Sequence, residues 1–341
     1  MNVRIGLLAT LALLAVGSPA HAQVPSTADP NDPAFIDDEN LPGTFSVIGR
    51  DPTTGELGIA VHSKTLAVGS RVRGGKGGVA VFAHQSGSNP LYSTIGVELI
   101  EAGWSPQEAL DFMVKGDSSR TSRQVAIVDI QGRTAAYSSP TISDWKGHKC
   151  GVDYCAQGNT LAGPQVVEAM ARYMEQSVGK EPLAERLLHA LTAGNEQGGD
   201  RRGMQSVGLM ILLPRSIADF GDRALDLRVD DARDPFTEMQ RVLNVRRGQD
   251  MAGGMNPLIA AKDYVGAMEV AQKALALSPA ADNIWVSMGQ IHLLAGRKTE
   301  ALAALRKAVE MNPWNKGQLR RDARFDAIKT DPEFVRIVGA S

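Results

Sequence analysis

A threonine that follows a glycine at the start of a strand-like run is the feature of this sequence best suited to chemistry. Thr44 follows Gly43 and opens the run TFSVIGRDPTTGELGIAVHSK. A threonine hydroxyl is a weak nucleophile unless a base lies beside it. A threonine that becomes the first residue of its chain carries that base itself, an α-amino group with a pKa of about 7.7–8.0. The pair therefore indicates a nucleophile freed by cleavage; the alternative is a threonine that only begins a strand.

Lys64 and Ser63 lie at the other end of the hairpin that this run predicts. Its two apolar-rich halves, TFSVIGRD and GELGIAVHSK, are joined by turn residues 52–55. Pairing of the strands would bring Lys64 close to the α-amine of Thr44, where a cation helps to keep the amine neutral. Ser63 would be a hydrogen-bonding neighbour. A solvated lysine at a strand end is the alternative for Lys64.

An acyl-transfer site also needs fixed N–H donors where the oxyanion develops. Gly158 and Asn159 precede a helix that is predicted to begin at Pro164. Backbone amides and the Asn159 side chain could converge in the turn that enters this helix. A turn that only starts the helix is the alternative.

Two further segments supply candidate substrate-binding side chains. In GGDRR, Arg201 could hold a substrate carboxylate in a bidentate manner, with Asp200 orienting it or holding an amine. In HQSGSNP, Gln85 and Asn89 are candidate polar walls of a pocket, although Asn89 before proline equally fits a turn. A solvated loop with a local ion pair is the alternative for the first segment.

Cys150 and Cys155 are the two cysteines of the chain and lie close together in GHKCGVDYC. In an oxidising compartment they could form a short-loop disulfide if the chain turns back at Gly151. Zinc, with His148 as a third ligand, is the competing idea, but structural zinc sites have four ligands at more regular spacing. The sequence has no G-x-S-x-G, H-E-x-x-H or P-loop motif. We therefore expect neither a metal nor a cofactor.

The N-terminus has the pattern of a secretory signal peptide. Arg4 precedes the apolar run IGLLATLALLAVG, and Ala20-His21-Ala22 fits a cleavage site. We expect a signal peptide at residues 1–22, a periplasmic or secreted protein, and a disordered leader at residues 23–43 that is rich in Pro, Asp and Asn. A formal net charge of −2 gives no reason to expect nucleic acid as a partner, nor a membrane after signal cleavage.

Residues 44–247 predict an α+β domain in which two largely antiparallel sheets lie between helical layers. Within the second predicted helix of this domain, Ser105 and Glu108 form a capping-box pattern. The predicted strands are TFSVIGRD, GELGIAVHSK, GGVAVFAHQ, two within RQVAIVDIQGRTAAYSS, MQSVGLMILLP and ALDLRVDD. The predicted helices are two within IGVELIEAGWSPQEALDFMVK, then VVEAMARYMEQ, PLAERLLHALTAGNEQ and DPFTEMQRVLNVRRGQD.

Residues 252–341 predict an all-α domain of helical repeats. Residues 251–284 and 285–318 match at a period of about 34 residues, as in the tetratricopeptide repeat. Matched pairs are Ala267 with Ala301, Ala274 with Ala308 and Pro279 with Pro313. A helical hairpin with chance alanines is the alternative. The tail should cap the stack with Phe325, Ile328, Phe334 and Ile337. The grooves of such repeats commonly receive extended peptides, so a protein or peptide partner is expected.

The first domain resembles a bacterial family catalogued as domain of unknown function 1028, which is grouped with the N-terminal nucleophile (Ntn) hydrolases. The likeness covers roughly residues 44–245. It runs through TFSVIGRDPTTGELGIAVHSKTLAVGS, HQSGSNPLYSTIGVELIEAGWSPQEAL, WKGHKC, AQGNTLAGPQVVEAM, GGDRRGMQSVGL and LDLRVDD. The resemblance implies a four-layer αββα sandwich whose first strand carries the nucleophile. It implies no substrate, because the family is largely uncharacterised.

Members of that family typically have this threonine after the start methionine or a processed leader. Here residues 23–43 separate the expected signal cleavage from Thr44, so a second cut at Gly43–Thr44 is required. The prediction is an exported Ntn-type amidohydrolase-like protein whose Thr44 attacks a small amide or peptide-like substrate. The alternative is a catalytically silent scaffold that binds a protein or peptide through its repeats. Whether the chain is cut before Thr44 distinguishes the enzyme from the scaffold. The sequence leaves open whether the chain is an enzyme and whether it is a homo-oligomer.

Overall fold

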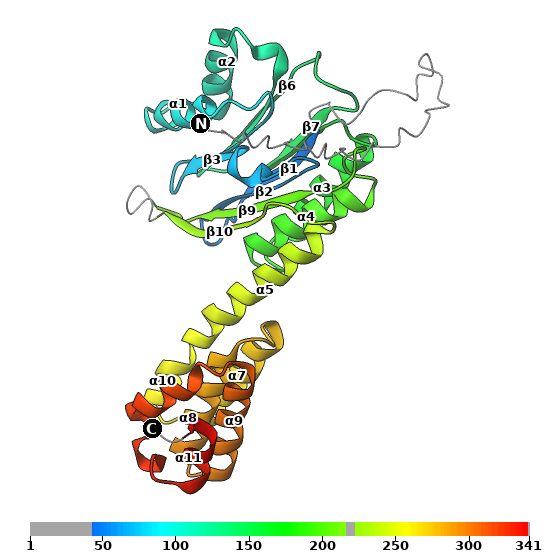
Figure 1. Ribbon diagram of the computed structural model, residues 1–341. Coiled ribbons are helices and arrows are strands. Elements are labelled where there is room, and N and C mark those ends of the chain that lie inside the picture. Colours follow the sequence, from blue (N-terminus) through cyan, green and yellow to red (C-terminus); the bar gives the residue numbers. More distant parts are fainter. Residues whose placement is uncertain (1–42, 216–221, 340–341) are drawn as a thin grey trace, which may run out of the picture. The chain divides into compact units, whose positions relative to one another are not determined.

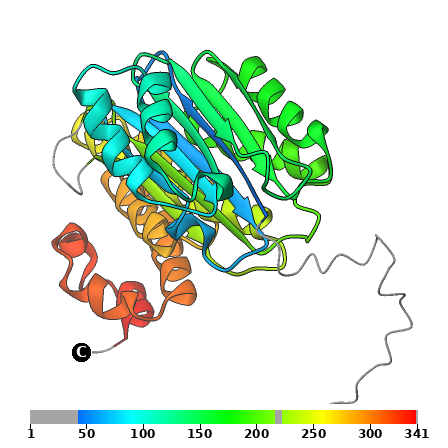
Figure 2. The same ribbon diagram turned by 90° about the horizontal axis from the view of Figure 1, so that it is seen from above.

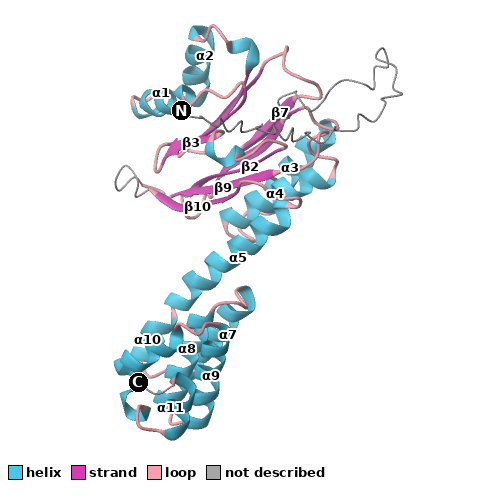
Figure 3. Ribbon diagram, viewed as in Figure 1, coloured by secondary structure: helices cyan, strands magenta, loops and turns pink. Residues whose placement is uncertain are grey.

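A computed structural model describes residues 43–215 and 222–339 of the chain. The expected signal peptide and leader lie outside the described residues, apart from Gly43. The described part is a mixed α/β fold with two antiparallel sheets, followed by a helical C-terminal region (Figure 1, Figure 3). In these residues no helix has both the length and the apolar character that crossing a membrane requires.

The strands are β1 (Thr44–Arg50), β2 (Leu57–Ser63), β3 (Arg73–Lys76), β4 (Ala80–Ser86), β5 (Arg123–Asp129), β6 (Thr134–Ser138), β7 (Gly147–Gly151), β8 (Tyr154–Asn159), β9 (Ser206–Leu212) and β10 (Arg223–Val229). The helices are α1 (Leu91–Glu101), α2 (Pro106–Gly116), α3 (Pro164–Gln176), α4 (Leu183–Glu196), α5 (Pro235–Gly253), α6 (Met255–Ala260), α7 (Tyr264–Leu277), α8 (Asp282–Leu294), α9 (Lys298–Met311), α10 (Asn315–Arg321) and α11 (Pro332–Val338).

Strand β1 lies in the middle of the larger sheet. The six-stranded sheet has the order β10-β9-β2-β1-β8-β7, and the four-stranded sheet has the order β3-β4-β5-β6. In the register of β1, Phe45 lies opposite His62 of β2, and Thr44 lies opposite Asn159 of β8. Strand β1 is therefore a central strand, and its first residue pairs with β8.

The alternation of side chains along the strands decides which residues form each core. On β1, Ile48 joins a cluster of buried aliphatic side chains from both sheets, including Val81 of β4 and Ala126 of β5. Phe45 and Val47 point the other way, into a cluster with helices α3 and α4. A separate cluster joins the four-stranded sheet to α1 and α2. Figure 2 shows α1 and α2 in cyan on one side of the strands and α3 and α4 in green on the other.

Most of the elements of residues 44–247 were predicted, including the capping box at Ser105 and Glu108. The prediction of a turn at Gly158 and Asn159 was wrong, because both residues pair with β1 as part of β8. The glycine-rich residues 73–76 were not predicted as a strand, yet they form β3. Gly74 and Gly75 of β3 fit there because an added Cβ would meet Ser93 and the carbonyl of Ala80.

The helical C-terminal region packs through the small residues that the repeat pattern singled out. Ala267, Ala274, Ala301 and Ala308 are fully buried. Gly289 of α8 allows close approach, since a Cβ there would lie 2.7 Å from the Leu305 side chain of α9. The expected capping residues Phe325, Ile328, Phe334 and Ile337 pack in one cluster with residues of α9.

Candidate functional site

The layer between the two sheets changes from apolar to polar at the end where β1 begins. Ile48 and Ile59 lie in its apolar part. Toward the start of β1 the same inward-facing positions are polar and buried: Thr44, Ser46, Ser63, Gln85, Gln124, Gln157 and Asn159. Buried polar side chains are costly unless they are hydrogen-bonded, so such a cluster needs a structural or chemical reason.

The carbonyl oxygen of Gly43 is surrounded by hydrogen-bond donors. The Thr44 hydroxyl donates to it at 2.6 Å, and Nη2 of Arg202 donates at 2.5 Å. The Ser63 hydroxyl also donates to this oxygen. The Ser63 oxygen itself lies 3.2 Å from the Thr44 oxygen. The carbonyl oxygen of the peptide bond that must be cut to free Thr44 thus accepts three hydrogen bonds.

Arg202 is fixed by a buried carboxylate. Its Nη2 and Nε donate to the two oxygens of Asp200 at 2.6 and 3.0 Å. Both side chains are nearly inaccessible, with 5% of Arg202 and none of Asp200 exposed. The guanidinium packs directly on Gly43, where an added Cβ would lie 2.7 Å from Nε. Glycine is therefore the residue that lets the arginine reach the carbonyl beside it.

A cavity of about 540 Å³ opens beside the Gly43–Thr44 bond. Three cationic residues, Lys64, Arg71 and Arg202, contribute to its wall, and among the described residues no carboxylate does. The remaining lining residues are Gly43, Thr44, Thr65, Leu66, Val68, Val72, Gln85, Ser86, Ser88 and Gln205. The cavity is therefore suited to a ligand that carries negative charge.

Behind Thr44, side-chain amides connect the two sheets. Gln85 Nε2 donates to the Thr44 carbonyl at 3.0 Å and to Gln124 Oε1 at 2.8 Å. Asn159 Nδ2 donates to the same Gln124 oxygen at 2.8 Å. The side chain of Asn159 is thus engaged with Gln124, and its Oδ1 is buried without a hydrogen-bond partner. Its predicted oxyanion role stays a prediction.

The structure gathers several of the predicted site residues around Thr44 and places others elsewhere. Ser63, Gln85 and Asp200 lie at the site as described above. Lys64 is exposed and lines the cavity, and its Nζ lies 3.5 Å from the Met204 carbonyl. Asn89 accepts a hydrogen bond from the Leu91 amide at 3.1 Å, which is the turn role left open by the sequence.

Arg201 and Arg202 have different surroundings from those expected. Arg201 is exposed and its Nη2 donates to the Asp144 carbonyl at 3.0 Å, whereas Arg202 is the partner of Asp200 at the site. The sequence predicts a substrate-binding role only for Arg201. Both arginines follow the same glycines, and the positive φ of Gly198, Gly199 and Gly203 sets the local chain direction. Spacing alone carried no signal that could distinguish them.

His62 lies on the helix-facing side of β2, opposite in direction to Ser63. Its ring lies 4.8 Å from Phe45 and 5.1 Å from Phe236 of α5, measured between centroids. Burial lowers its pKa to about 3, with smaller contributions from the charges of Arg202 and Lys64. His62 is therefore neutral and forms part of the core.

Cys150 of β7 and Cys155 of β8 are joined by a disulfide across the hairpin. The chain turns back after Gly151, as the pairing requires. The described residues contain no group of three or more His, Cys, Asp or Glu side chains arranged to hold a metal ion.

Comparisons with known proteins match two segments of the chain to two families. Residues 44–239 match a family described as "Family of unknown function (DUF1028)", and residues 258–316 match the tetratricopeptide repeat. The chain is similar to the crystal structure of protein SPO2555 from Silicibacter pomeroyi, titled as a DUF1028 protein. That match has a TM-score of 0.53 and 27% identity and covers 59% of this chain and 84% of the other. None of the curated proteins matches the chain.

Proposed function

This chain belongs to the family of unknown function DUF1028, and we propose that its first domain is an amide-bond hydrolase with Thr44 as the nucleophile. The observation that carries the proposal is the geometry at the Gly43 carbonyl: the Thr44 hydroxyl lies against it, and Ser63 and Arg202 both donate to its oxygen. Donors aimed at a carbonyl oxygen stabilise the negative charge that develops there when a nucleophile attacks its carbon.

The first step in this proposal is self-cleavage. The Thr44 oxygen forms a bond to the carbonyl carbon of Gly43, the C–N bond breaks, and the hydroxyl proton passes to the nitrogen. The product is an ester between Gly43 and the Thr44 oxygen, with the Thr44 amine now free. Water then hydrolyses the ester and leaves Thr44 as the first residue. Arg202 and Ser63 would hold the oxyanion in both steps.

The same groups would then act on a substrate amide. The free amine of Thr44 takes the proton of its own hydroxyl as the oxygen attacks, and it returns a proton to the departing amine. The substrate carbonyl would take the position that the Gly43 carbonyl occupies in the uncut chain. Water releases the acyl group from the threonine ester. Lys64 at the cavity wall would favour the neutral, basic form of the amine.

The layering of the first domain supports the finer assignment to the Ntn-type αββα sandwich. Two sheets face each other, with a helical pair on each outer side and the candidate nucleophile at the start of a central strand. We also propose that residues 44–247 and 252–341 act as separate domains and that the protein is exported. The disulfide supports export, because such bonds persist in oxidising compartments.

A turnover assay tests the proposed activity. The purified protein is incubated with a panel of small chromogenic amides, and any acyl adduct is located by peptide mass mapping. We expect hydrolysis with an adduct on Thr44, retained in part by Thr44→Ser and abolished by Thr44→Val. Hydrolysis that survives in Thr44→Val would overturn the assignment of the nucleophile.

The repeats favour a second function, because tetratricopeptide-like repeats generally mediate protein interactions. Their described surface includes a cavity of about 600 Å³ between residues of α9 and α11. Recruitment of a protein or peptide there is compatible with an active or a silent first domain. Capture of a partner by the chain, lost when Arg306 and Arg336 in that cavity are both replaced by Ala, would support it.

A further inference from the structure

A second hollow lies beside the candidate active site and leads to an inference about the substrate. We propose that the amide substrate carries an apolar acyl chain and a carboxylate, as in an N-acyl amino acid, and that the acyl chain binds between α1 and α2. This inference rests on the proposed function and specifies its substrate class.

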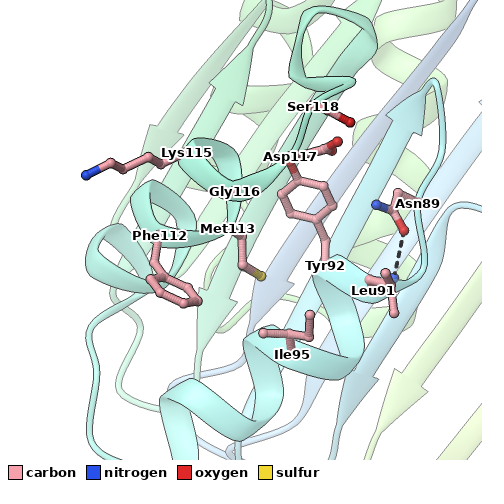
Figure 4. A pocket seen from close by; sticks show the side chains of 10 residues that line it. All are labelled: Asn89, Leu91, Tyr92, Ile95, Phe112, Met113, Lys115, Gly116, Asp117 and Ser118. Atoms are coloured by element: carbon pink, nitrogen blue, oxygen red, sulfur yellow. Dashed lines mark hydrogen bonds between the residues drawn. The ribbon is translucent and has the colours of Figure 1, made fainter.

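The groove between α1 and α2 has a volume of about 640 Å³ and a largely apolar wall (Figure 4). Leu91 and Phe112 are 55% and 56% exposed, although large apolar side chains on a monomer surface are usually scattered rather than gathered in one hollow. Ile95 and Met113 line the same groove. Trp104 supports Phe112 in an edge-to-face contact with centroids 5.6 Å apart. The groove thus offers a preformed apolar surface.

The charged side chains of this groove do not favour a polar ligand. Asp117 accepts hydrogen bonds from Arg123 Nε at 2.7 Å and from the Tyr92 hydroxyl at 3.1 Å. The bond from Arg123 lowers the pKa of Asp117 and compensates its charge. Lys115, the other charged lining residue, is exposed. An uncharged chain can therefore bind without leaving a buried ion unpaired.

The groove and the cavity at Thr44 meet along one loop. Ser88 lines the cavity and its neighbour Asn89 lines the groove, so the two walls are one residue apart. The Ser88 hydroxyl donates to the Arg71 carbonyl at 2.9 Å and lies 2.9 Å from His84 Nδ1. This loop is therefore fastened to the cationic wall of the cavity. In the proposed complex, a ligand held at Thr44 extends past Ser88 onto Leu91.

The positive charge of the cavity wall favours a carboxylate at the end of the ligand that lies beyond the amide. Lys64 and Arg71 are exposed cations in its wall, and Asp200 is committed to Arg202. A carboxylate close to the amide would pair with Lys64 or Arg71. A cationic wall whose lining lies one residue from that of an apolar groove fits an amphiphilic amide better than a neutral or basic one.

Acyl-chain length and the carboxylate can be varied separately in the test. The substrates are N-acetylglycine, N-octanoylglycine and the uncharged N-octanoylglycinamide. Each fully buried methylene strengthens binding roughly fourfold. Because the groove is open on one side, the six additional methylenes of the octanoyl chain are only partly buried. We therefore expect kcat/KM to rise ~100-fold from the acetyl to the octanoyl substrate. We expect ~10-fold loss when the carboxylate is removed.

Variants locate the two parts of the ligand. Phe112→Ser should lower kcat/KM for the octanoyl substrate ~10-fold and leave the acetyl substrate unchanged. Arg71→Gln should lower kcat/KM for both carboxylic acid substrates and leave kcat/KM for N-octanoylglycinamide unchanged. Val178→Ser is the matched control, because Val178 is 49% exposed and lies outside the groove. Equal effects of Phe112→Ser and Val178→Ser would overturn the assignment of the groove.

A binding measurement separates failure of the inference from failure of the proposed function. The probe is the ketone in which a methylene replaces the amide nitrogen of N-octanoylglycine, titrated by calorimetry. Tight binding of the ketone that depends on Phe112, without turnover of any amide, would refute the proposed hydrolase activity and support the proposed class of ligand. Turnover of short neutral amides with no chain-length effect would refute the ligand class and keep the hydrolase. A change in sedimentation on Phe112→Ser, with kcat/KM unaltered, would assign the groove to self-association instead.

Discussion

The guanidinium of Arg202 donates at once to the carbonyl of Gly43 and to the carboxylate of Asp200. A planar group with several N–H donors can make both contacts, whereas a lysine ammonium is a single charge on a flexible stem. Asp200 fixes the orientation of the guanidinium, and Gly43 leaves room for it because it has no Cβ. The proposed cleavage therefore depends on Arg202, whereas the sequence predicted a role only for Arg201, as a partner for a substrate carboxylate.

Arg202→Lys tests that distinction. We expect it to preserve the charge beside Asp200 but to slow cleavage of the Gly43–Thr44 bond by about 100-fold, the usual loss when one oxyanion donor is removed. Arg201→Lys, one residue away, should cleave at the wild-type rate. Time courses of intact mass after synthesis give both rates. Slow cleavage in Arg201→Lys beside a normal rate in Arg202→Lys would contradict the role proposed for Arg202.

Strands in which apolar and polar residues alternate strongly could be predicted from the sequence. Strands that are rich in glycine, or that form only because a neighbouring strand pairs with them, could not. Strands β1 and β2 follow from apolar periodicity, and a turn at residues 52–55 connects them. Strand β3 contains two glycines, and β8 ends in Gly158 and Asn159, so neither shows the pattern of a strand. Their pairing with β4 and β1 overrides the local preference for a turn. The polar pair Thr44 and Ser63 could be placed because hairpin register is local; the contact of Arg202, distant in sequence, could not.

The hairpin of β7 and β8 supplies a prediction about the disulfide. Replacing both Cys150 and Cys155 with Ala should lower the free energy of unfolding by about 2 kcal/mol, the loop-entropy contribution for a ring this short. Urea denaturation of the variant and the wild type measures the difference. Addition of a reductant should destabilise the wild type alone. A reductant effect of equal size in both proteins would show that the bond does not contribute.

At the scale of the whole molecule, the buried His62 links stability to pH. Its pKa falls from an ordinary 6.5 to about 3 in the folded protein, because burial disfavours the imidazolium. The unfolded chain therefore binds the proton first, and stability is lost as pH falls from about 6.5 toward about 3. Between pH 7 and pH 5 the loss from this residue should be about 2 kcal/mol.

His62→Phe should remove that part of the pH dependence. Neither ring nitrogen of His62 has a hydrogen-bond partner, so phenylalanine forfeits no bond and keeps the contacts with Phe45 and Phe236. Denaturation curves at pH 7 and pH 5 should then differ less for the variant than for the wild type. The contribution of His84, whose pKa burial lowers to about 4, is common to both proteins and cancels. Parallel losses in the two proteins would contradict the assignment.

The N-terminus of the mature protein shows whether Thr44 is freed by its own chemistry. Intact mass and N-terminal sequencing should be measured for the purified wild type and for Thr44→Ala. We expect the wild type to begin at Thr44 and the variant to keep the Gly43–Thr44 bond intact. A wild-type chain that still contains this bond would have no free amine on Thr44, and Thr44 could not then act as the proposed nucleophile.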